Sequence, residues 1–213
     1  MTDRVAELAP KKAALAPKKE GTDTRDRIVR AAADLFYLQG YSGTSLDTVA
    51  RKAGVNRGSL YYFFRSKKNL VLAVIDYFER LIHQNFIDAA EEGASGGRGR
   101  LERLAEFYSG MPRASSPCCG CPIGKLSLEL SGLDDDMRLR LKDVWAGVIG
   151  RIERMVREAQ TEEALHPEAD AAILARVFFE QIQGAHIIAR TTLDAEVLRA
   201  DCRRAFESLP WMT

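Results

Sequence analysis

Apolar residues recur every three or four positions along most of the chain from Thr24 onward, which is the period of an amphipathic α-helix. The first such stripe ends at Gly40, a residue that commonly follows the last turn of a helix. It consists of Ile28, Ala31, Ala32, Leu35 and Phe36. The pattern therefore predicts a helix that begins near Thr24 and stops at Gly40.

Two short helical segments and one long one follow, and polar residues that favour helix ends mark their bounds. Thr44 and Asp47 have the spacing of a capping box for a helix over 45–52, which Gly54 would end. Asn56 is placed to cap a helix that reaches about Phe63. Ser66 is placed to cap a fourth helix, which runs to about residue 89 with the stripe Leu70, Val74, Phe78, Leu81 and Ile82.

The rest of the chain also has helical periodicity. Its apolar stripes predict helices over 101–111, 122–130, 137–160, 169–191 and 194–208, and the glycine-rich stretch 91–99 predicts a flexible loop. No segment alternates between apolar and polar residues as a half-buried strand does. The fold class that follows is all-α.

Composition and charge narrow the possibilities. The chain of 213 residues is 46% hydrophobic and 29% charged, which is typical of a globular protein able to form a sizeable core. Its net charge of +1 hides an asymmetry, because residues 22–70 hold nine Lys and Arg against four Asp and Glu. A basic end fits either a module that binds a polyanion or chance clustering. Residues 1–21 repeat Leu-Ala-Pro-Lys-Lys and predict a disordered basic arm.

No apolar run is long enough to span a bilayer, and the first residues lack the apolar core of a secretion signal. We therefore expect a cytoplasmic protein without a membrane partner. Thiols stay reduced in that compartment, so the four cysteines do not predict a disulfide framework.

The order of the short helices from residue 45 to residue 63, with a glycine turn between them, is typical of a helix-turn-helix. In that motif the N-terminal edge of the second helix enters the major groove of DNA. Here this edge is Asn56, Arg57, Gly58 and Ser59. Arg57 is suited to read guanine, and Tyr61 and Tyr62 are placed to contact phosphates.

Lys67 and Lys68 begin the fourth helix, where the helix dipole disfavours positive charge. An anion opposite them would reverse that effect, and helix N-termini bind phosphate through free amides. We expect DNA phosphates to be these anions, and a solvated surface pair is the alternative.

The run from Ala31 to Ile75, with its aromatic stretch YYFF and the helix start SKKNL, resembles the TetR family of bacterial transcriptional repressors. The resemblance implies an all-helical homodimer that binds a palindromic DNA operator and releases it when a small molecule binds. It implies a helix-turn-helix domain over 22–68 and a larger ligand-sensing and dimerisation domain over 69–213. By position, the family's DNA contacts fall on Thr44, Ser45, Asn56, Arg57, Gly58, Ser59, Tyr61, Tyr62 and Lys67, to which we add Lys68.

The last two helices have apolar stripes that would form a four-helix interface in such a dimer. Packing within one protomer would use the same residues, and the resemblance favours the dimer. The stripes consist of Leu174, Phe178, Ile182 and Ala185, and of Val197, Leu198 and Phe206.

Three cysteines lie within four positions, in the stretch PCCGCPIG at 117–124. They are too close together for a tetrahedral zinc site, so we expect no metal and no other cofactor. Cys118 and Cys121 have the C-x-x-C spacing of a thiol–disulfide enzyme, but the βαβ context of that class is absent. Pro122 at a first helical position puts Cys121 at the N-cap, where the helix dipole should lower its pKa. A buried, inert core thiol is the alternative.

A narrower resemblance concerns the electrophile-responsive TetR repressors, which include N-ethylmaleimide-responsive and acrylate-responsive members. Their pattern G-C-x-x-G-x-L-x-x-E is matched by Gly120, Cys121, Gly124, Leu126 and Glu129. This resemblance implies that Cys121 senses the electrophile. Arg190 stands where the N-ethylmaleimide-responsive type has a lysine that pairs with the cysteine. Relatives that share the segment also include those that bind unreactive ligands.

Trp145, Phe178 and His186 are further candidates for the wall of a ligand pocket, although core packing is the usual role of such residues. The sequence contains no nucleotide-binding loop, metalloprotease motif or nucleophile elbow. An enzyme is therefore not expected.

Overall fold

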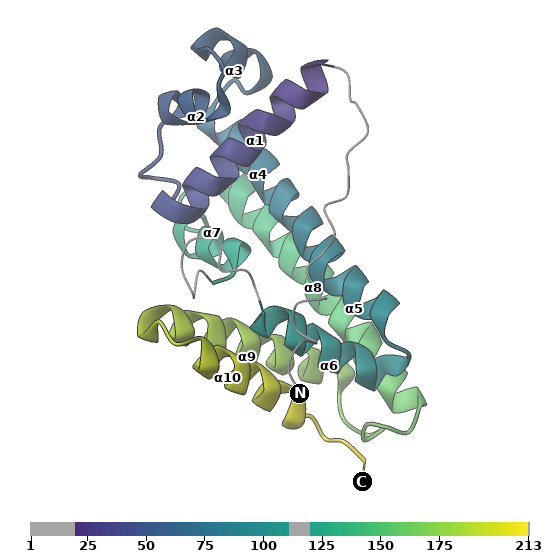
Figure 1. Ribbon diagram of the computed structural model, residues 1–213. Helices are drawn as coiled ribbons and strands as arrows, with labels where there is room; N and C mark the ends of the chain where they lie inside the picture. The colour runs from purple at the N-terminus through teal and green to yellow at the C-terminus, as the bar shows by residue number, and fades with distance from the viewer. Residues whose placement is uncertain (1–19, 111–119, 213) are drawn as a thin grey trace, which may run out of the picture.

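The computed structural model describes residues 20–110 and 120–212, and within these ranges the chain is helical with no strand ladder. The N-terminal helices form one end of an elongated molecule, and the C-terminal helices form the other (Figure 1). The elements are α1 (Glu20–Gln39), α2 (Leu46–Ala53), α3 (Arg57–Phe63), α4 (Lys67–Ile82), the π-helix η2 (His83–Ile87), α5 (Asp88–Gly93), α6 (Gly96–Ser109), α7 (Pro122–Leu130), α8 (Asp135–Thr161), α9 (Ala171–Thr192) and α10 (Ala195–Glu207).

The predicted helix ends around the short helices are confirmed with one exception. Gly54 ends α2 in the left-handed conformation with φ 65°, and Asn56 and Ser66 cap α3 and α4. The exception is the start of α2, because its cap is Ser45, whose hydroxyl accepts from the Thr48 amide at 3.1 Å. Thr44 is instead buried, and its hydroxyl donates to the Gly40 carbonyl at 2.8 Å. The capping box predicted at Thr44 and Asp47 is therefore wrong.

The predicted fourth helix is divided into three elements. An α-helix ends at Ile82, the five residues of η2 form a π-turn, and α5 continues to Gly93. The chain therefore stays helical past residue 89, where the pattern predicted an end.

The flexible loop predicted at 91–99 is also wrong, because α6 begins at Gly96. The backbone of Gly97 lies directly against α8, where an added Cβ would be 2.2 Å from the Met155 carbonyl oxygen. Its amide donates to Glu162 at 3.0 Å. Glycine at this position permits a close helix contact, and it does not mark a flexible segment.

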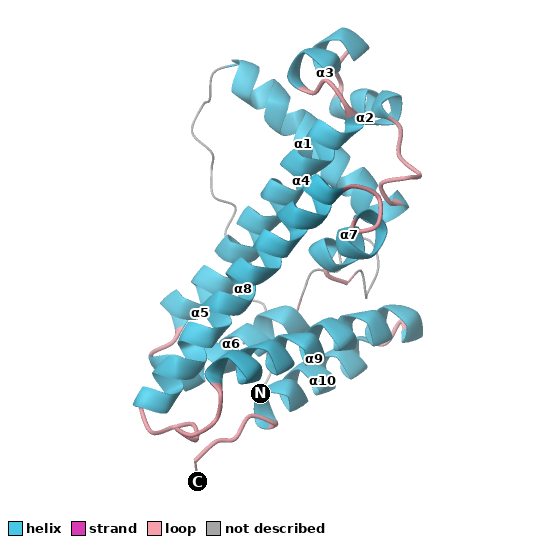
Figure 2. Cartoon of the chain, turned by 180° about the vertical axis from the view of Figure 1, so that it is seen from behind, coloured by secondary structure: helices cyan, strands magenta, loops and turns pink. Residues whose placement is uncertain are grey.

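Helix α8 runs alongside α4 and α5 (Figure 2). Ion pairs join α8 to α4 and to α5. Arg140 binds Asp76 and Glu79 on α4, and Arg151 binds Asp88 and Glu91 on α5. No helix in the described ranges combines the length and the apolarity that a bilayer span requires.

The stripes predicted for dimerisation mostly fill the core of the single protomer. Helices α9 and α10 pack against each other and against α6 and α8, and this packing buries most of the residues concerned. The exposed fraction is 9% or less for Phe178, Ile182, Ala185, Leu198 and Phe206, whereas Leu174 and Val197 are half-buried. For the five buried residues the structure shows a contact within the protomer, and for Leu174 and Val197 a role in dimerisation stays a prediction.

Candidate DNA-binding surface and candidate ligand site

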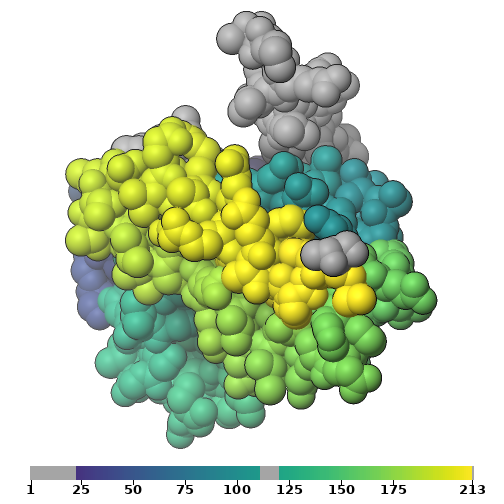
Figure 3. Space-filling model, turned by 90° about the horizontal axis from the view of Figure 1, so that it is seen from below, coloured from purple at the N-terminus to yellow at the C-terminus, as the bar shows by residue number. Residues whose placement is uncertain are grey.

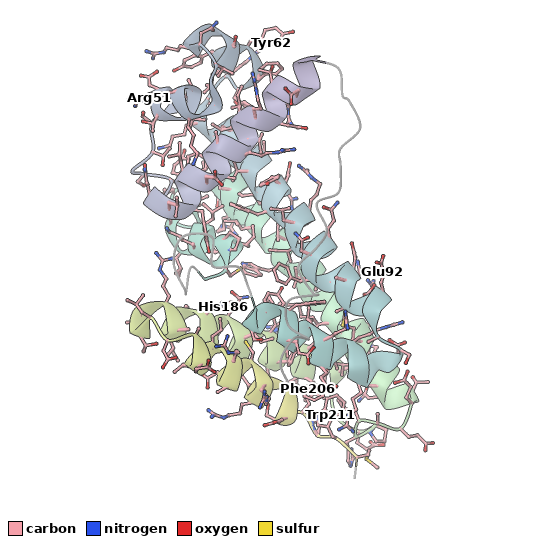
Figure 4. The ribbon with its side chains drawn as sticks, viewed as in Figure 1. Arg51, Tyr62, Glu92, His186, Phe206 and Trp211 are labelled. Carbon is pink, nitrogen blue, oxygen red and sulfur yellow. The ribbon has the colours of Figure 1, made fainter. Side chains whose placement is uncertain are left out.

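Helix α3 presents its N-terminal edge to solvent. Leu60 anchors the helix in the core with 1% exposure, while Arg57 and Gly58 are exposed and Ser59 is half-buried. The Asn56 side chain accepts from the Ser59 amide at 2.7 Å, so its oxygen acts as the helix cap. Tyr62 is 82% exposed and projects from the end of the molecule opposite α9 and α10 (Figure 4).

The Arg57 side chain contacts Tyr61 and Asp47. Its guanidinium lies 5.5 Å from the ring centroid of Tyr61 and within 3.5 Å of an Asp47 carboxylate oxygen. These contacts are solvent-exposed and therefore weak, so the guanidinium remains free to bind another acceptor. Ser45 lies beside this edge as the cap of α2, whereas the buried Thr44 hydroxyl offers nothing to a ligand at the surface.

The two lysines at the start of α4 have different partners. Lys67 lies over the ring of Tyr41, 4.2 Å from its centroid. Lys68 binds Asp134 and Asp136 at 2.7 and 2.6 Å. In the structure the anions opposite Lys68 therefore come from the start of α8, and its contact with DNA phosphate stays a prediction.

Cys121 is the N-cap of α7, as predicted, and its sulfur accepts from the Gly124 amide at 3.5 Å. The side chain is 6% exposed. Burial raises the pKa of the Cys121 thiol, and the opposing effect of the Gly124 and Ile123 amides does not offset it. The prediction of a lowered pKa is therefore wrong, because it took account of the helix end and not of the loss of solvent.

The side chain from α9 that acts on the Cys121 thiol is Gln183, whose amide favours the thiolate slightly. Arg190 lies two turns further along α9 and is exposed. The ion pair expected between Arg190 and Cys121 is therefore replaced by a neutral contact. Cys118 lies outside the described residues, and Cys121 and Cys202 are free thiols.

The other predicted pocket residues surround the same region. His186 is 3% exposed on the side of α9 that faces α6 and α7 (Figure 4), and burial lowers its pKa to about 4. Trp145 donates to the Ser127 hydroxyl at 3.0 Å and lies 5.6 Å from the Phe179 ring. Phe178 is fully buried in the core. Within the described ranges, no group of three or more His, Cys, Asp and Glu side chains is arranged to hold a metal ion.

Helix α7 also contacts the N-terminal helices directly. The Tyr37 hydroxyl donates to the Gly120 carbonyl at 2.7 Å, and Lys125 donates to the Tyr37 carbonyl. Glu129 accepts from the amides of Tyr41 and Ser42 at 2.7 and 2.6 Å. One helix therefore connects the Cys121 turn to α1 and to the turn that precedes α2.

Sequence reasoning missed most of these connecting residues. Glu129 was recognised only as part of a family pattern, and its pairing with a turn 88 residues away has no local signal. Two residues near Cys121 were also not predicted: Gln183, and Tyr108, a buried residue of α6 whose ring centroid lies 6.1 Å from that of His186. Because they lie on or beside the apolar stripes of α6 and α9, the sequence pattern indicates only that they belong to the core or its border.

Two family models match the chain. Residues 28–74 match the model described as bacterial regulatory proteins, tetR family, and residues 97–206 match the model described as tetracyclin repressor-like, C-terminal domain. Together these ranges contain both the α3 surface and the surroundings of Cys121.

Curated relatives agree with these matches. The chain is 33% identical to the transcriptional regulator AcuR of Cereibacter sphaeroides over 83% of this chain and 80% of that protein. It is 25% identical to the transcriptional repressor NemR of Escherichia coli over 83% of this chain and 88% of that protein.

Solved structures share the fold. The regulatory protein TetR from Rhodobacter sphaeroides superposes with a TM-score of 0.78 at 27% identity, over 87% of this chain and 98% of the other. The reduced form of Escherichia coli NemR gives 0.76 at 24% identity, over 89% and 98%. With a helix-turn-helix model and a C-terminal model matched in order, and a relative above 30% identity, the chain belongs to the TetR family of bacterial regulatory proteins, which are transcriptional regulators and not enzymes.

Proposed function

We propose that this protein is a homodimeric repressor that binds a palindromic operator through α3 and releases it when the core around Cys121 is occupied or modified. The observation that carries the proposal is the position of α7. Its first turn holds Cys121, and the same helix is hydrogen-bonded to α1 and to the turn before α2. A displacement of α7 that follows a change at Cys121 would therefore move residues bonded to the helices that would bind DNA.

The proposed DNA-binding domain spans residues 22–68, and the proposed sensing domain spans residues 69–213. The exposed edge of α3 supports direct reading of DNA bases by Arg57. Contacts with the sugar–phosphate backbone of the DNA are proposed for Ser59, Tyr61 and Tyr62. Lys67 adds positive charge at the start of α4. We place operator binding in the bacterial cytoplasm, where the DNA is.

The dimer interface is proposed on the outer face of α9, which the sequence stripes did not select. Ile173, Val177, Ile187 and Ile188 are between 41% and 60% exposed and lie along one side of the helix. Gly184 lies on the same side, and an added Cβ there would meet no atom within 4 Å. Packing within the protomer therefore does not require glycine, whereas close approach of a second helix would use it. Figure 3 shows α9 and α10 spread over one broad face.

Two forms of induction are compatible with Cys121. The matching pattern in electrophile-responsive repressors supports modification of its thiol. The raised pKa supports the second form, a non-covalent inducer, because little thiolate forms in the core at neutral pH. Both forms of induction act through α7, but only the covalent form requires the Cys121 thiol. A thiol–disulfide enzyme is not supported, since the family consists of regulators.

A gel-shift series on intergenic DNA next to the gene tests operator binding. We expect retardation that weakens steeply as salt rises, because phosphate contacts release counterions. Arg57→Ala should reduce discrimination at one base position by about 1–3 kcal/mol, and Lys67→Ala should weaken binding to all sequences alike. Lys142→Ala, a change at an exposed lysine on α8, is the matched control and should bind as the wild type does. Absence of retardation for every fragment at low salt would refute the proposal.

Release from operator DNA by N-ethylmaleimide, in wild type and in Cys121→Ser, separates the two forms of induction. Loss of release in the variant, with the adduct located on Cys121 by mass spectrometry, supports covalent sensing. Equal release in both proteins assigns the reactive thiol to another cysteine of the chain, whereas no release in either protein leaves the non-covalent form.

A further inference from the structure

Three polar atoms in the core near Cys121 have no hydrogen-bond partner among the described residues. They are the Tyr108 hydroxyl, His186 Nε2 and the Gln183 amide nitrogen, which lies near the Cys121 sulfur but makes no hydrogen bond of normal geometry to it. Tyr108 is 1% exposed and His186 is 3% exposed, so solvent does not satisfy them. Leaving one such group unpaired costs about 1–3 kcal/mol, and folded proteins leave few of them.

These atoms belong to one cluster, although they come from different helices. The rings of Tyr108 on α6 and His186 on α9 have centroids 6.1 Å apart. Gln183 precedes His186 by three positions and shares its helix face. An added Cβ on Gly124 would lie 3.2 Å from the Gln183 amide oxygen and 4.0 Å from the Cys121 sulfur. Helices α6, α7 and α9 thus converge on the Cys121 turn.

Aromatic side chains form the apolar part of the same region. Phe86 stacks on Tyr108 with ring centroids 5.1 Å apart, and Phe179 meets its edge at 5.8 Å. Trp145 lies beyond Phe179. In a bound complex these rings would contact the apolar body of a small ligand, and the unpaired atoms would bind one polar group on it.

The hydrogen-bonding character of the cluster indicates which polar group this is. The Tyr108 hydroxyl and the Gln183 amide both donate, and the neutral His186 ring donates from Nε2 in one of its tautomers. A carbonyl oxygen, with two lone pairs, accepts from two of these groups at once. Within the described ranges, no cationic side chain contributes to the pKa shifts of Tyr108, Cys121 or His186. A buried carboxylate would therefore lack a counter-charge, which disfavours it strongly.

We propose that Tyr108, Gln183 and His186 form the polar end of the inducer site, and that the inducer is a small neutral carbonyl compound with an apolar body. The inference rests on the proposed function, since it names the class of molecule that acts on the α7 connection. The ligand would take up the hydrogen-bonding capacity that the core leaves unused.

The test is calorimetric titration of the full-length protein with matched panels of 2-butanone, cyclohexanone and acetophenone, the carboxylates propionate, cyclohexanecarboxylate and benzoate, and hydrocarbons of the same size. We expect at least one ketone to bind more tightly than its carboxylate and its hydrocarbon. The same ketone should weaken operator binding measured by fluorescence anisotropy. No binding by any ketone, or a preference for carboxylates or hydrocarbons, would overturn the proposal.

Tyr108→Phe distinguishes a binding role from a structural one. It removes an unpaired hydroxyl, so the ligand-free protein should be as stable as wild type or more stable, while ketone binding weakens about 10-fold. Hydrocarbon binding should not change. Tyr77→Phe, on α4, is the matched control and should leave ketone binding unaltered. Unaltered ketone binding in Tyr108→Phe would refute the site. Operator binding without ligand is measured in the same series. If the ligand-free protein does not bind operator DNA, the proposed function is refuted and not only the ligand site.

Discussion

Replacing Glu129 by glutamine tests the connection between α7 and the N-terminal helices. The Glu129 carboxylate accepts two backbone amides, those of Tyr41 and Ser42, at 2.7 and 2.6 Å. A hydrogen bond to a charged acceptor contributes about 1.5–3 kcal/mol, and a neutral one contributes about 1 kcal/mol. Glutamine has one acceptor oxygen, so one bond is lost and the other becomes neutral. With allowance for partial solvent access, we expect a loss of about 2 kcal/mol.

The direct measurement is amide hydrogen exchange by nuclear magnetic resonance. Since about 1.4 kcal/mol corresponds to a factor of ten, the amides of Tyr41 and Ser42 should exchange roughly 30-fold faster in Glu129→Gln. Glu153→Gln is the matched control, because among the described residues the half-buried Glu153 pairs only with the exposed Arg157 one turn along the same helix. Such a pair contributes about 0.5 kcal/mol or less. Exchange of Tyr41 and Ser42 at the wild-type rate in Glu129→Gln would refute the connection.

The pH dependence gives a second measurement of the same contact. Burial by itself raises the pKa of Glu129, but the Ser42 and Tyr41 donors more than offset it, so the pKa lies below its ordinary value of 4.5. A depressed carboxyl pKa stabilises the folded state above the unfolded-state value, and this contribution is lost as pH falls through the folded-state value. The stability difference between wild type and Glu129→Gln in urea should therefore be full at pH 7 and shrink below about pH 4.5. A difference that is constant down to pH 3 would contradict this account.

Three further changes have defined outcomes. Gly97→Ala places a Cβ 2.2 Å from the Met155 carbonyl oxygen, so the free energy of unfolding in urea should fall by about 1–3 kcal/mol, whereas Gly132→Ala, with no atom within 4 Å, should not lower it comparably. Ile188→Glu puts a charge on the outer face of α9 and should yield monomers in analytical ultracentrifugation; a dimer that persists would move the interface elsewhere. Removal of residues 1–20 should weaken operator binding and flatten its salt dependence, and an unchanged salt slope would assign the arm no role.

The sequence by itself determined the local features of this protein. The helical periodicity, the Gly54 turn and the caps at Asn56, Ser66 and Cys121 are confirmed, because each depends on residues within about one helical turn. The all-α class and the TetR family also follow from the linear pattern and its motifs.

Tertiary structure decided what depends on distant partners. An apolar stripe shows that a face is buried but not against which surface, so the stripe of α9 proved to be core and the opposite face is left exposed. The N-cap position of Cys121 was visible in the sequence, yet its pKa follows from burial by helices far along the chain. The Lys68 ion pairs, the Glu129 contacts and the cluster at His186 likewise join residues that only folding brings together.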